Sequence, residues 1–350
     1  MSQTINDPPP QPAVVALDVG GTFVKWLVAD HTGVLHHGMA PTRAADGPER
    51  SFGVVLDTVD SALATLPSTH VPVGIGLAVP GTVDERRGVC VYSENLGWRE
   101  LPVVERVFEH TGLPVGFGHD VRAGATAEWR LGAGRGITDQ MYVSVGTGLA
   151  AALLLDDRMV VSGGYAGEIG HGGSIEGEPC ACGGRGCAET VASAAAIARR
   201  YAALTGTPVD GARDVLARAR EGDSTARRVW DDAVEVLGSV MADLVRVTGV
   251  ARIVVGGGLV HAGETLLAPL RDRVRERLTV HPAPHILPAV LGGAAGSWGA
   301  ALLGWQAADI DLDPVLAAYT VAARTRDSTD ETERPGTPRP TEGMFDKERK

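Results

Sequence analysis

A glycine-containing pattern that occurs twice constrains the fold of this chain more than any other feature. Residues 14–30, VVALDVGGTFVKWLVAD, resemble residues 141–157, MYVSVGTGLAAALLLDD, and each segment is predicted to form a strand, a Gly/Thr turn and a second strand. Glycine lets the backbone approach a ligand closely, and exposed N–H groups in such a turn attract anions. Either hairpin alone is more simply a tight turn, but the repetition favours two lobes that grip one polyphosphate.

The other patterns indicate an α/β protein. Strand-like runs such as 14–19 and 73–79 alternate with helical patterns. In the clearest helix, apolar residues from Val229 to Val245 recur at helical spacing, and Gly249 follows as a stop signal. We expect this helix to belong to the buried core.

Composition indicates an ordinary globular protein and argues against some classes of partner. With 350 residues, 44% hydrophobic and 21% charged, the chain is long enough for two lobes that each bury a core. A net charge of -11 argues against nucleic acid as the main partner. Polar residues and glycines interrupt the longest apolar stretch, 141–155, which excludes a membrane helix, and the N-terminus lacks the features of a secretory signal. We expect a cytoplasmic protein with disordered, polar tails at 1–12 and 324–350.

Three of the four cysteines lie close together, which in a reducing compartment favours a metal site over disulfides. His171, Cys180, Cys182 and Cys187 offer the ligand set of a closed zinc site with three thiols and one imidazole. The CxC spacing is tighter than in zinc fingers, but neighbouring glycines would let the loop wrap the ion. A lone histidine or cysteine is usually structural, whereas four together favour a structural zinc. Cys90 lies apart and is expected to be buried.

The first hairpin also carries a carboxylate and a cation. Asp18 is expected at a strand end beside Gly20, Gly21 and Thr22, and Lys25 follows on the next strand. A carboxylate there would suit Mg²⁺, while amides and a hydroxyl suit phosphate oxygens. The spacing differs from that of the GxxxxGK[ST] phosphate loop. The hairpin is therefore predicted to be a place for a metal and phosphates.

Four further residues have two interpretations each. Glu168 in GEIGH and Glu189 in GCAET would accept hydrogen bonds from sugar hydroxyls, or would be a solvated loop charge and a residue of a first helical turn. Asn95 and Trp98 in ENLGW are ligand contacts or, more commonly, a turn former and a core residue. The residues alone leave these alternatives open.

Asp120 follows the apolar run VGFGH and precedes VRAGATAEWRL, a predicted helix. By itself an aspartate at this place is best explained as the helix N-cap. The end of a strand that opens into a helix is also where α/β proteins place reactive groups. The two roles are compatible.

Taken in order, the motifs DVGGT, AVPGTVD, ENLGW, HD, GTG, GEIGH, CxCGxxGC, GGG and LGGAAG resemble the ROK family of sugar kinases and repressors over residues 14–303. GEIGH followed by CxCGxxGC is the most specific combination. The resemblance implies a two-lobed α/β fold like that of actin and hexokinase, the ribonuclease H-like sugar kinase fold, with the active-site cleft between the lobes. We expect a small lobe at 13–121 plus about 301–323, and a large lobe at 122–300 that contains the zinc loop 171–187.

The resemblance also implies a role for each matching residue. The first phosphate hairpin would comprise Asp18, Gly20, Gly21, Thr22 and Lys25, the second Thr147 and Gly148, and the segment beside the adenosine Gly256, Gly257 and Gly258. The sugar site would comprise Asn95, His119, Asp120, Glu168, His171 and Glu189, with Asp120 as general base. His171 would have two roles, because one ring nitrogen would bind zinc and the other would face the sugar.

Two positions depart from the family pattern. The residue before the base is usually an asparagine that helps to read sugar hydroxyls, but here it is His119, and Arg122 replaces a second asparagine. A histidine donates or accepts and titrates near neutrality, which would suit an altered hydroxyl or an amino group, or it is a neutral variant. The identity of the sugar stays open among glucose, mannose, N-acetylglucosamine, N-acetylmannosamine and kanosamine.

The expected reaction is in-line transfer of the terminal phosphate of ATP to the 6-hydroxyl of a hexose, with Mg²⁺ and hairpin amides neutralising charge. Polyphosphate is an alternative donor, and the family implies a homodimer or homotetramer. A sugar-responsive repressor is disfavoured, because about a dozen residues precede the first strand, too few for a DNA-binding helix-turn-helix. A non-catalytic sugar sensor is disfavoured by Asp120 and by the two hairpins.

Overall fold

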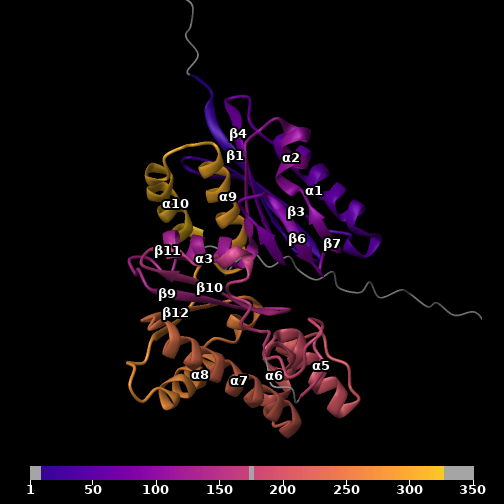
Figure 1. The fold of residues 1–350 in the computed structure, drawn as a ribbon, viewed down its shortest axis with the longest axis vertical. Coiled ribbons are helices and arrows are strands. Elements are labelled where there is room, and N and C mark those ends of the chain that lie inside the picture. The colour runs from indigo at the N-terminus through magenta and orange to yellow at the C-terminus, as the bar shows by residue number, and fades with distance from the viewer. Residues whose placement is uncertain (1–8, 173–176, 327–350) are drawn as a thin grey trace, which may run out of the picture.

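Two five-stranded sheets with the same topology form the body of the protein (Figure 1). The computed structural model describes residues 9–172 and 177–326. The strand order is β3-β2-β1-β4-β8 in the first sheet and β11-β10-β9-β12-β13 in the second. In both sheets the first three strands in chain order pair antiparallel and the last two join in parallel. The repeat in the sequence is therefore a repeat of the fold.

The strands of the first sheet are mostly longer than those of the second. The first sheet contains β1 (Gln11–Val19), β2 (Phe23–Asp30), β3 (Gly33–Pro41), β4 (His70–Val79) and β8 (Val115–His119). The second contains β9 (Gln140–Val145), β10 (Leu149–Leu155), β11 (Arg158–Met159), β12 (Arg252–Gly256) and β13 (His285–Pro288). A third, small sheet contains β5 (Thr82–Asp84), β6 (Val89–Ser93) and β7 (Trp98–Leu101).

The two predicted hairpins are confirmed. One joins β1 to β2, and in its turn the N–H of Gly20 donates to the carbonyl of Phe23 at 2.9 Å. The other joins β9 to β10, and the N–H of Gly146 donates to the carbonyl of Gly148 at 3.0 Å. Each sheet thus presents one glycine-containing turn at the end of its central strand.

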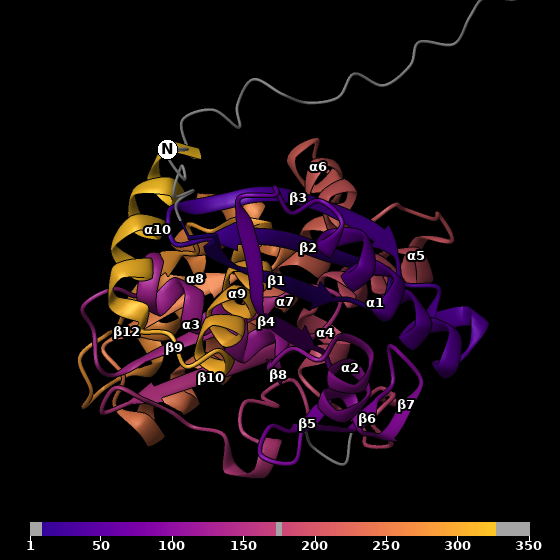
Figure 2. The same ribbon diagram turned by 90° about the horizontal axis from the view of Figure 1, so that it is seen from above.

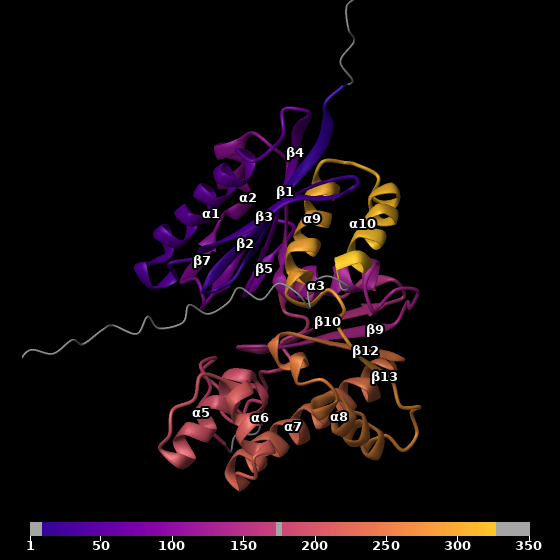
Figure 3. The ribbon, with the colours of Figure 1, turned by 180° about the vertical axis from the view of Figure 1, so that it is seen from behind.

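Helices cover both faces of the first sheet and the outer face of the second (Figures 1 and 3). On the first sheet, α1 (Pro48–Leu63) and α2 (Val103–Thr111) lie opposite α9 (Ala295–Ala307) and α10 (Leu312–Arg326). Beyond the second sheet lie α5 (Ala194–Thr205), α6 (Ala212–Arg220), α7 (Ser224–Thr248) and α8 (Glu264–Arg277). The short elements are α4 (Glu189–Ala192), η1 (Ala44–Asp46), η2 (Ser162–Gly164), η3 (Gly258–Ala262) and η4 (Gly292–Ala294).

The helix α3 (Asp120–Leu131) lies between the two sheets. It packs against α9 on one side and against β9 and β10 on the other, and Figure 2 shows these elements next to one another. Because α3 begins directly after β8, the side chains at its N-terminus lie where the two halves of the molecule meet.

Glycines let α9 pack very closely on its neighbours. A Cβ on Gly76 of β4 would lie 1.8 Å from the carbonyl oxygen of Ala300, and a Cβ on Gly116 of β8 would lie 2.1 Å from the α9 backbone. A Cβ on Gly299 of α9 would lie 2.0 Å from the carbonyl oxygen of Ala123 in α3. No larger residue fits at these positions without moving backbone. The strands β4 and β8 and the helices α3 and α9 therefore form one closely packed block.

The predicted core helix is confirmed as α7. It begins after the N-cap Asp223 and ends at Gly249, whose φ of 69° is left-handed. Val229, Leu237 and Met241 are buried in the core beneath the second sheet. The run that stood out by its spacing is thus a core element, as expected.

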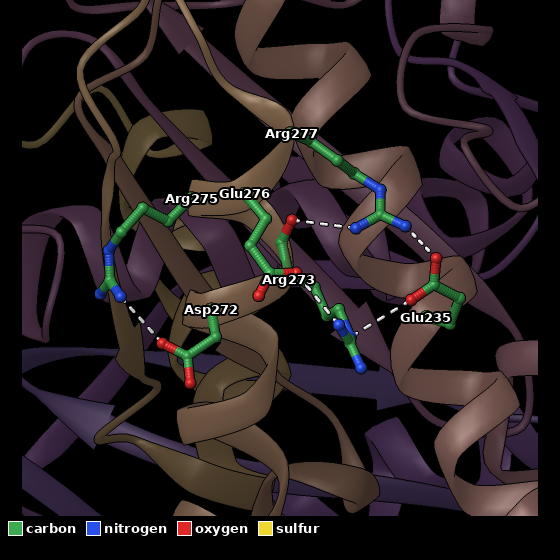
Figure 4. A network of polar contacts seen from close by, with 6 residues as sticks. All are labelled: Glu235, Asp272, Arg273, Arg275, Glu276 and Arg277. Atoms are coloured by element: carbon green, nitrogen blue, oxygen red, sulfur yellow. Dashed lines mark hydrogen bonds and ion pairs between the residues drawn. The ribbon is translucent and has the colours of Figure 1, made fainter.

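A network of ion pairs lies on the outer surface between α7 and α8 (Figure 4). Glu235 of α7 pairs with Arg273 of α8 at 3.2 Å and also with Arg277. Two further pairs lie within α8, Arg273 with Glu276 and Arg275 with Asp272. Exposed pairs of this kind contribute about 0–1 kcal/mol each, so the contact between the two helices depends mainly on their buried apolar residues.

Regular structure reaches slightly into both predicted tails. β1 begins at Gln11, and α10 continues to Arg326. Outside the described residues lie 1–8, 327–350 and residues 173–176 of the predicted zinc loop. The lobe boundaries given above stay a prediction. Among the helices that the structure describes, none combines the length and the apolar character needed to span a bilayer.

Candidate active site

Asp18 lies at the end of β1, against the first turn of α9. A Cβ on Gly296 would lie only 2.5 Å from its Oδ2, so the carboxylate occupies the space that this glycine leaves open. The side chain is 18% exposed, and Oδ2 lies 4.0 Å from the Nζ of Lys25. Lys25 in turn donates to the carbonyl oxygen of Gly293 at 3.0 Å. The first hairpin and the turn before α9 therefore form one polar unit.

The N-cap of α3 is His119, one residue earlier than the Asp120 cap favoured by the sequence alone. His119 ends β8 with extended backbone (φ -74°, ψ 138°), as a cap requires, whereas Asp120 is already helical. The N–H of Val121 donates to Nδ1 of His119 at 3.2 Å and to Oδ1 of Asp120 at 2.7 Å. The two side chains thus share the capping role, and Asp120 uses one of its carboxylate oxygens for it.

The Asp18 and Asp120 carboxylates are close enough to influence each other. Burial raises the pKa of Asp18 to about 6, helped by the negative charge of Asp120 and opposed by Lys25. Burial also raises the pKa of Asp120 to about 6, opposed by the N–H of Val121 and the charge of Arg122. Because the Asp120 side chain is 31% exposed, a ligand can reach it. A reachable carboxylate of this basicity is ionised at neutral pH and is well suited to accept a proton.

His119 is only 5% exposed and lies beside a buried arginine. Burial and, to a lesser extent, the charge of Arg122 lower the pKa of its ring to about 4, against the opposing charges of Glu168 and Glu85. Arg122 is 4% exposed, and its Nε donates to Oε1 of Glu85 at 2.9 Å. Glu85 follows β5 in the polar run DERR, where a solvated charge is the natural interpretation, so its pairing with the buried Arg122 could not be predicted from the sequence.

Glu189 connects the second hairpin to His171. Its Oε2 accepts the backbone N–H of Leu149 at 2.8 Å and would lie 2.7 Å from a Cβ on Gly148. Its Oε1 lies 4.0 Å from Nε2 of His171. Glu189 is also the first residue of α4, so the helix-start interpretation holds together with these contacts.

The four predicted metal ligands come together. The donor atoms of His171, Cys180, Cys182 and Cys187 all lie within 4.8 Å of one another. Nδ1 of His171 lies 3.6 Å from Sγ of Cys180, and Sγ of Cys182 lies 3.6 Å from Sγ of Cys187. Tetrahedral zinc, with bonds of about 2.0–2.3 Å, holds its ligand atoms about 3.5–3.8 Å apart. The cluster therefore fits such an ion, with Nδ1 of His171 toward the thiols and Nε2 toward Glu189.

The ENLGW turn contacts the first hairpin. Asn95 is exposed between β6 and β7, and a Cβ on Gly21 would lie 3.2 Å from the Asn95 Cβ. Trp98 is buried, and its Nε1 donates to Oγ of Ser51 at 2.8 Å, so its core interpretation is confirmed. Glu168 is half-buried in the loop before His171, and its charge acts on His119. Cys90 is fully buried, as expected.

The GGG segment lies beside the second hairpin. β12 ends at Gly256, and a 3-10 helix begins at Gly258. A Cβ on Gly257, whose φ is 79°, would lie 2.5 Å from the carbonyl oxygen of Val145, where β9 enters the hairpin. Thr147 is exposed in that hairpin. The GGG segment, expected beside the adenosine, is therefore a neighbour of the second hairpin, expected at the phosphates.

Glu128 of α3 is a functional candidate that the sequence interpretation missed. The side chain is buried, and Oε2 accepts the N–H of Ala133 at 2.9 Å while Oε1 accepts the N–H of Leu291 at 2.7 Å. Burial raises the pKa of this carboxyl against those two hydrogen bonds. The sequence does contain one signal of this buried carboxylate: Glu128 lies among the small apolar residues of AGATAEW. A charged residue in such surroundings is rarely buried without a partner.

Duplicated sheets with glycine hairpins, and carboxylates at the ends of β1 and β8, define a two-sheet α/β protein of the hexokinase-like class. Residues 14–307 match the model of the ROK family, and the chain belongs to this family. It is 32% identical to a glucokinase of Halalkalibacterium halodurans over 80% of this chain and 88% of that protein. A glucokinase of Streptomyces coelicolor is 30% identical over 82% of this chain and 96% of its own length.

Solved structures of the family confirm the fold. The ROK hexokinase of Thermus thermophilus has a TM-score of 0.73 at 32% identity, covering 84% of this chain and 98% of that chain. A ROK family glucokinase of Streptomyces griseus, solved in complex with glucose and AMPPNP, has a TM-score of 0.72 at 30% identity, covering 84% of this chain and 99% of that chain. The family also contains regulators, and a xylose repressor of Caldicellulosiruptor bescii is 25% identical over 76% of this chain and 70% of its own length.

Proposed function

We propose that this protein is an ATP-dependent hexose kinase that phosphorylates the 6-hydroxyl, with Asp120 as general base. The main support is the carboxylate of Asp120. A ligand can reach this carboxylate, its pKa is raised to about 6, and it lies near Asp18 of the first hairpin. The relative from Streptomyces griseus, which binds glucose and AMPPNP, supports the choice of ligands.

The proposed reaction depends chiefly on positioning. The N–H groups of Gly21 and Thr22 in the first turn, and of Thr147 and Gly148 in the second, would hold phosphate oxygens. Lys25 would offset the phosphate charge. Asp120 would accept the proton of the sugar hydroxyl as the hydroxyl oxygen attacks the γ-phosphorus in line with the leaving ADP oxygen. Asn95, Glu168, His171 and Glu189 would orient the sugar through their polar groups, each a proposal carried over from the family.

Two metals belong to the proposal. Asp18 would hold, through water, the Mg²⁺ that accompanies ATP, and this ion supplies charge neutralisation at the phosphates. The four ligands His171, Cys180, Cys182 and Cys187 fill the coordination sphere of zinc, so that ion would brace the loop and take no part in bond cleavage. In this arrangement His171 would connect the brace to the sugar site.

A coupled assay of ADP formation with a panel of hexoses and amino sugars tests the proposal. We expect sugar-dependent ADP release, with glucose preferred and mannose, N-acetylglucosamine, N-acetylmannosamine and kanosamine as the alternative substrates. Replacing ATP with polyphosphate tests the alternative donor. Absence of ADP release with every sugar, together with sugar binding by calorimetry, would favour a sensor and reject the kinase. We also propose a homodimer or homotetramer, which sedimentation would measure.

A further inference from the structure

Arg122, in the first turn of α3, is a buried cation whose hydrogen bonds are incomplete. The residue is 4% exposed, and its Nε donates to Oε1 of Glu85 at 2.9 Å. Nη1 and Nη2 are buried as well, and neither makes a hydrogen bond to a residue that the structure describes. A buried charge without a full set of partners lowers stability, because the charge has lost its hydration. Stability alone therefore does not explain an arginine at this position.

The pair of Arg122 and Glu85 lies beside the proposed base. Arg122 follows the N-cap His119 by three residues, so the two side chains lie on the same side of the first helical turn. Oε1 of Glu85 would lie 3.7 Å from a Cβ on Gly118, the residue before His119. The charge of Arg122 acts on His119 and also on Asp120. Arg122 thus brings a permanent positive charge to the point where β8 passes into α3.

The two carboxylates of the site have different cations. Oδ2 of Asp18 lies 4.0 Å from Nζ of Lys25. Burial is the largest influence on the pKa of Asp120 and raises it to about 6, and the charge of Arg122 opposes this rise. His119 supplies no charge at neutral pH, because burial and, to a lesser extent, Arg122 lower the pKa of its ring to about 4. Among the described residues, Arg122 is therefore the cation that acts on Asp120.

We propose that Arg122 is a positioning residue that acts through the general base, a role that rests on the kinase function proposed above. Held by Glu85, its buried positive charge keeps Asp120 in the ionised form that accepts the proton of the sugar hydroxyl. Because Nη1 and Nη2 are covered, Arg122 does not contact the sugar, although it replaces the second asparagine of the family pattern. Arg122 therefore sets the pH range in which the base works, and other residues bind the sugar.

A pH profile also reports on the other charged and titratable groups around Asp120, which come from several elements. They are Asp18 at the end of β1, Lys25 of β2, Glu85 after β5, His119 at the end of β8, Tyr142 of β9 and Glu168 in the loop before His171. Burial raises the pKa of Asp18 to about 6 as well, so the two aspartates titrate in the same range. The carboxyl group of Asp120 must therefore be observed directly.

Carboxyl ¹³C NMR of the aspartate-labelled, substrate-free protein measures this titration without any activity. The Asp120 signal, assigned by its loss in Asp120→Asn, should have a midpoint near pH 6 in the wild type. Arg122→Met keeps an unbranched side chain but removes the charge, so the midpoint should rise by about one pH unit. Arg122→Lys keeps the charge and should titrate close to the wild type. Glu85→Gln keeps an acceptor for Nε but removes the opposing negative charge, so its midpoint should fall.

The kinetic effect should depend on pH. In Arg122→Met, kcat/KM for the hexose should be about fivefold below that of the wild type at pH 6, because about one-fifth as much base is ionised there. At pH 9, where Asp120 is ionised without help, kcat/KM should equal or exceed the wild-type value. KM should change less than about threefold. The control Arg200→Met removes an arginine of α5 that is paired with Asp232 at 2.8 Å and has a buried Nη1 without a hydrogen bond to a described residue. This control should keep the Asp120 midpoint and the pH profile of the wild type.

Each outcome supports or rejects the proposal. An equal loss of kcat/KM at pH 6 and pH 9 would show a structural role, and a raised KM at both values would show that Arg122 contacts the sugar. An unchanged Asp120 midpoint in Arg122→Met would overturn the proposal whatever the activity. If Arg122→Met does not fold, an unchanged or raised midpoint in Glu85→Gln would do the same. A wild type that releases no ADP with any sugar would reject the kinase function, whereas the NMR titration would still test the effect of Arg122 on Asp120.

Discussion

Glu128 accepts the backbone N–H of Leu291 at 2.7 Å, across 163 positions of sequence. This contact joins α3, which begins with the proposed base, to the turn before α9. That turn receives the hydrogen bond from Lys25 to Gly293, and Gly296 in the first turn of α9 packs against Asp18. The buried carboxylate of Glu128 therefore connects α3 to the turn that contacts the first hairpin.

Replacing Glu128 with alanine should destabilise the protein and disturb the first hairpin. Two backbone N–H groups lose their acceptor, and each unsatisfied group costs about 1–3 kcal/mol. We expect a loss of about 2–4 kcal/mol in the free energy of unfolding, measured by urea titration, and a higher KM for ATP. The stability of Glu128→Gln, which keeps one acceptor oxygen, should lie between that of the wild type and that of Glu128→Ala. Equal stability of all three proteins would show that the link is unimportant.

Asp120→Asn should lower kcat by about 10²–10⁴-fold, because the amide cannot accept the proton of the hydroxyl. The helix cap survives through the amide oxygen and Nδ1 of His119, so the far-UV circular dichroism and the zinc content should not change. Steady-state kinetics and metal analysis measure both. Near-normal turnover in this variant would sink the assignment of the base.

The pH dependence of kcat/KM should show an acid limb with an apparent pKa near 6. Burial raises the pKa of Asp120 to about 6, and the protonated carboxylic acid cannot act as base. Activity should therefore fall about tenfold per pH unit below the limb and reach a plateau above pH 7. The limb should be missing from the residual activity of Asp120→Asn. A limb near pH 4 would mean that the base is not desolvated.

Asp18→Asn should stabilise the protein in a manner that depends on pH. Burial raises the pKa of Asp18 from 3.8 to about 6, so the unfolded chain loses this proton first as pH rises, and the folded wild type loses stability between these values. Above pH 6 the variant should be more stable by about 1–3 kcal/mol, and below pH 4 the difference should vanish. Urea unfolding of both proteins at pH 4 and at pH 8 measures this difference in stability. The variant should still lose activity, since Asp18 belongs to the proposed phosphate site.

Removing zinc with a chelator should weaken nucleotide binding as well as the loop itself. Glu189 contacts both His171 and the N–H of Leu149, so a displaced His171 ring disturbs the second hairpin. We expect the midpoint of thermal unfolding to fall and the Kd for AMPPNP, measured by calorimetry, to rise about 10-fold. Glu189→Ala should show the same weakening with zinc still bound, whereas Glu189→Gln keeps an acceptor for Leu149. Unchanged nucleotide affinity in the metal-free protein would rule out this coupling.

Local chemistry explains what could be predicted from the sequence. The turn at Gly20, the helix end at Gly249 and the cluster around Cys182 depend on nearby residues, so their patterns are visible in the chain. The cap of α3 was assigned to Asp120 instead of His119, because aspartate is the commoner cap and the last residue of β8 could not be located from its composition.

Contacts between distant segments could not be predicted. Glu85 and Glu128 look like ordinary charges in sequence, and only the packing of α3 against α9 and the third sheet gives them Arg122 and Leu291 as partners. The topology of the fold decides which distant residues come into contact, and no local spacing in the sequence encodes that topology.

The glycine contacts of Gly76, Gly116 and Gly299 have a consequence for motion during turnover. They leave no slack between α9, β4, β8 and α3, and Asp18 packs against Gly296 of α9, so Asp18 and Asp120 are held in one closely packed block. In the proposed kinase, any closing movement would then move the second half, with the turn at Gly146 and the segment at Gly257, toward Asp120. The distance between the two carboxylates is therefore set when the chain folds and would stay the same throughout the proposed reaction.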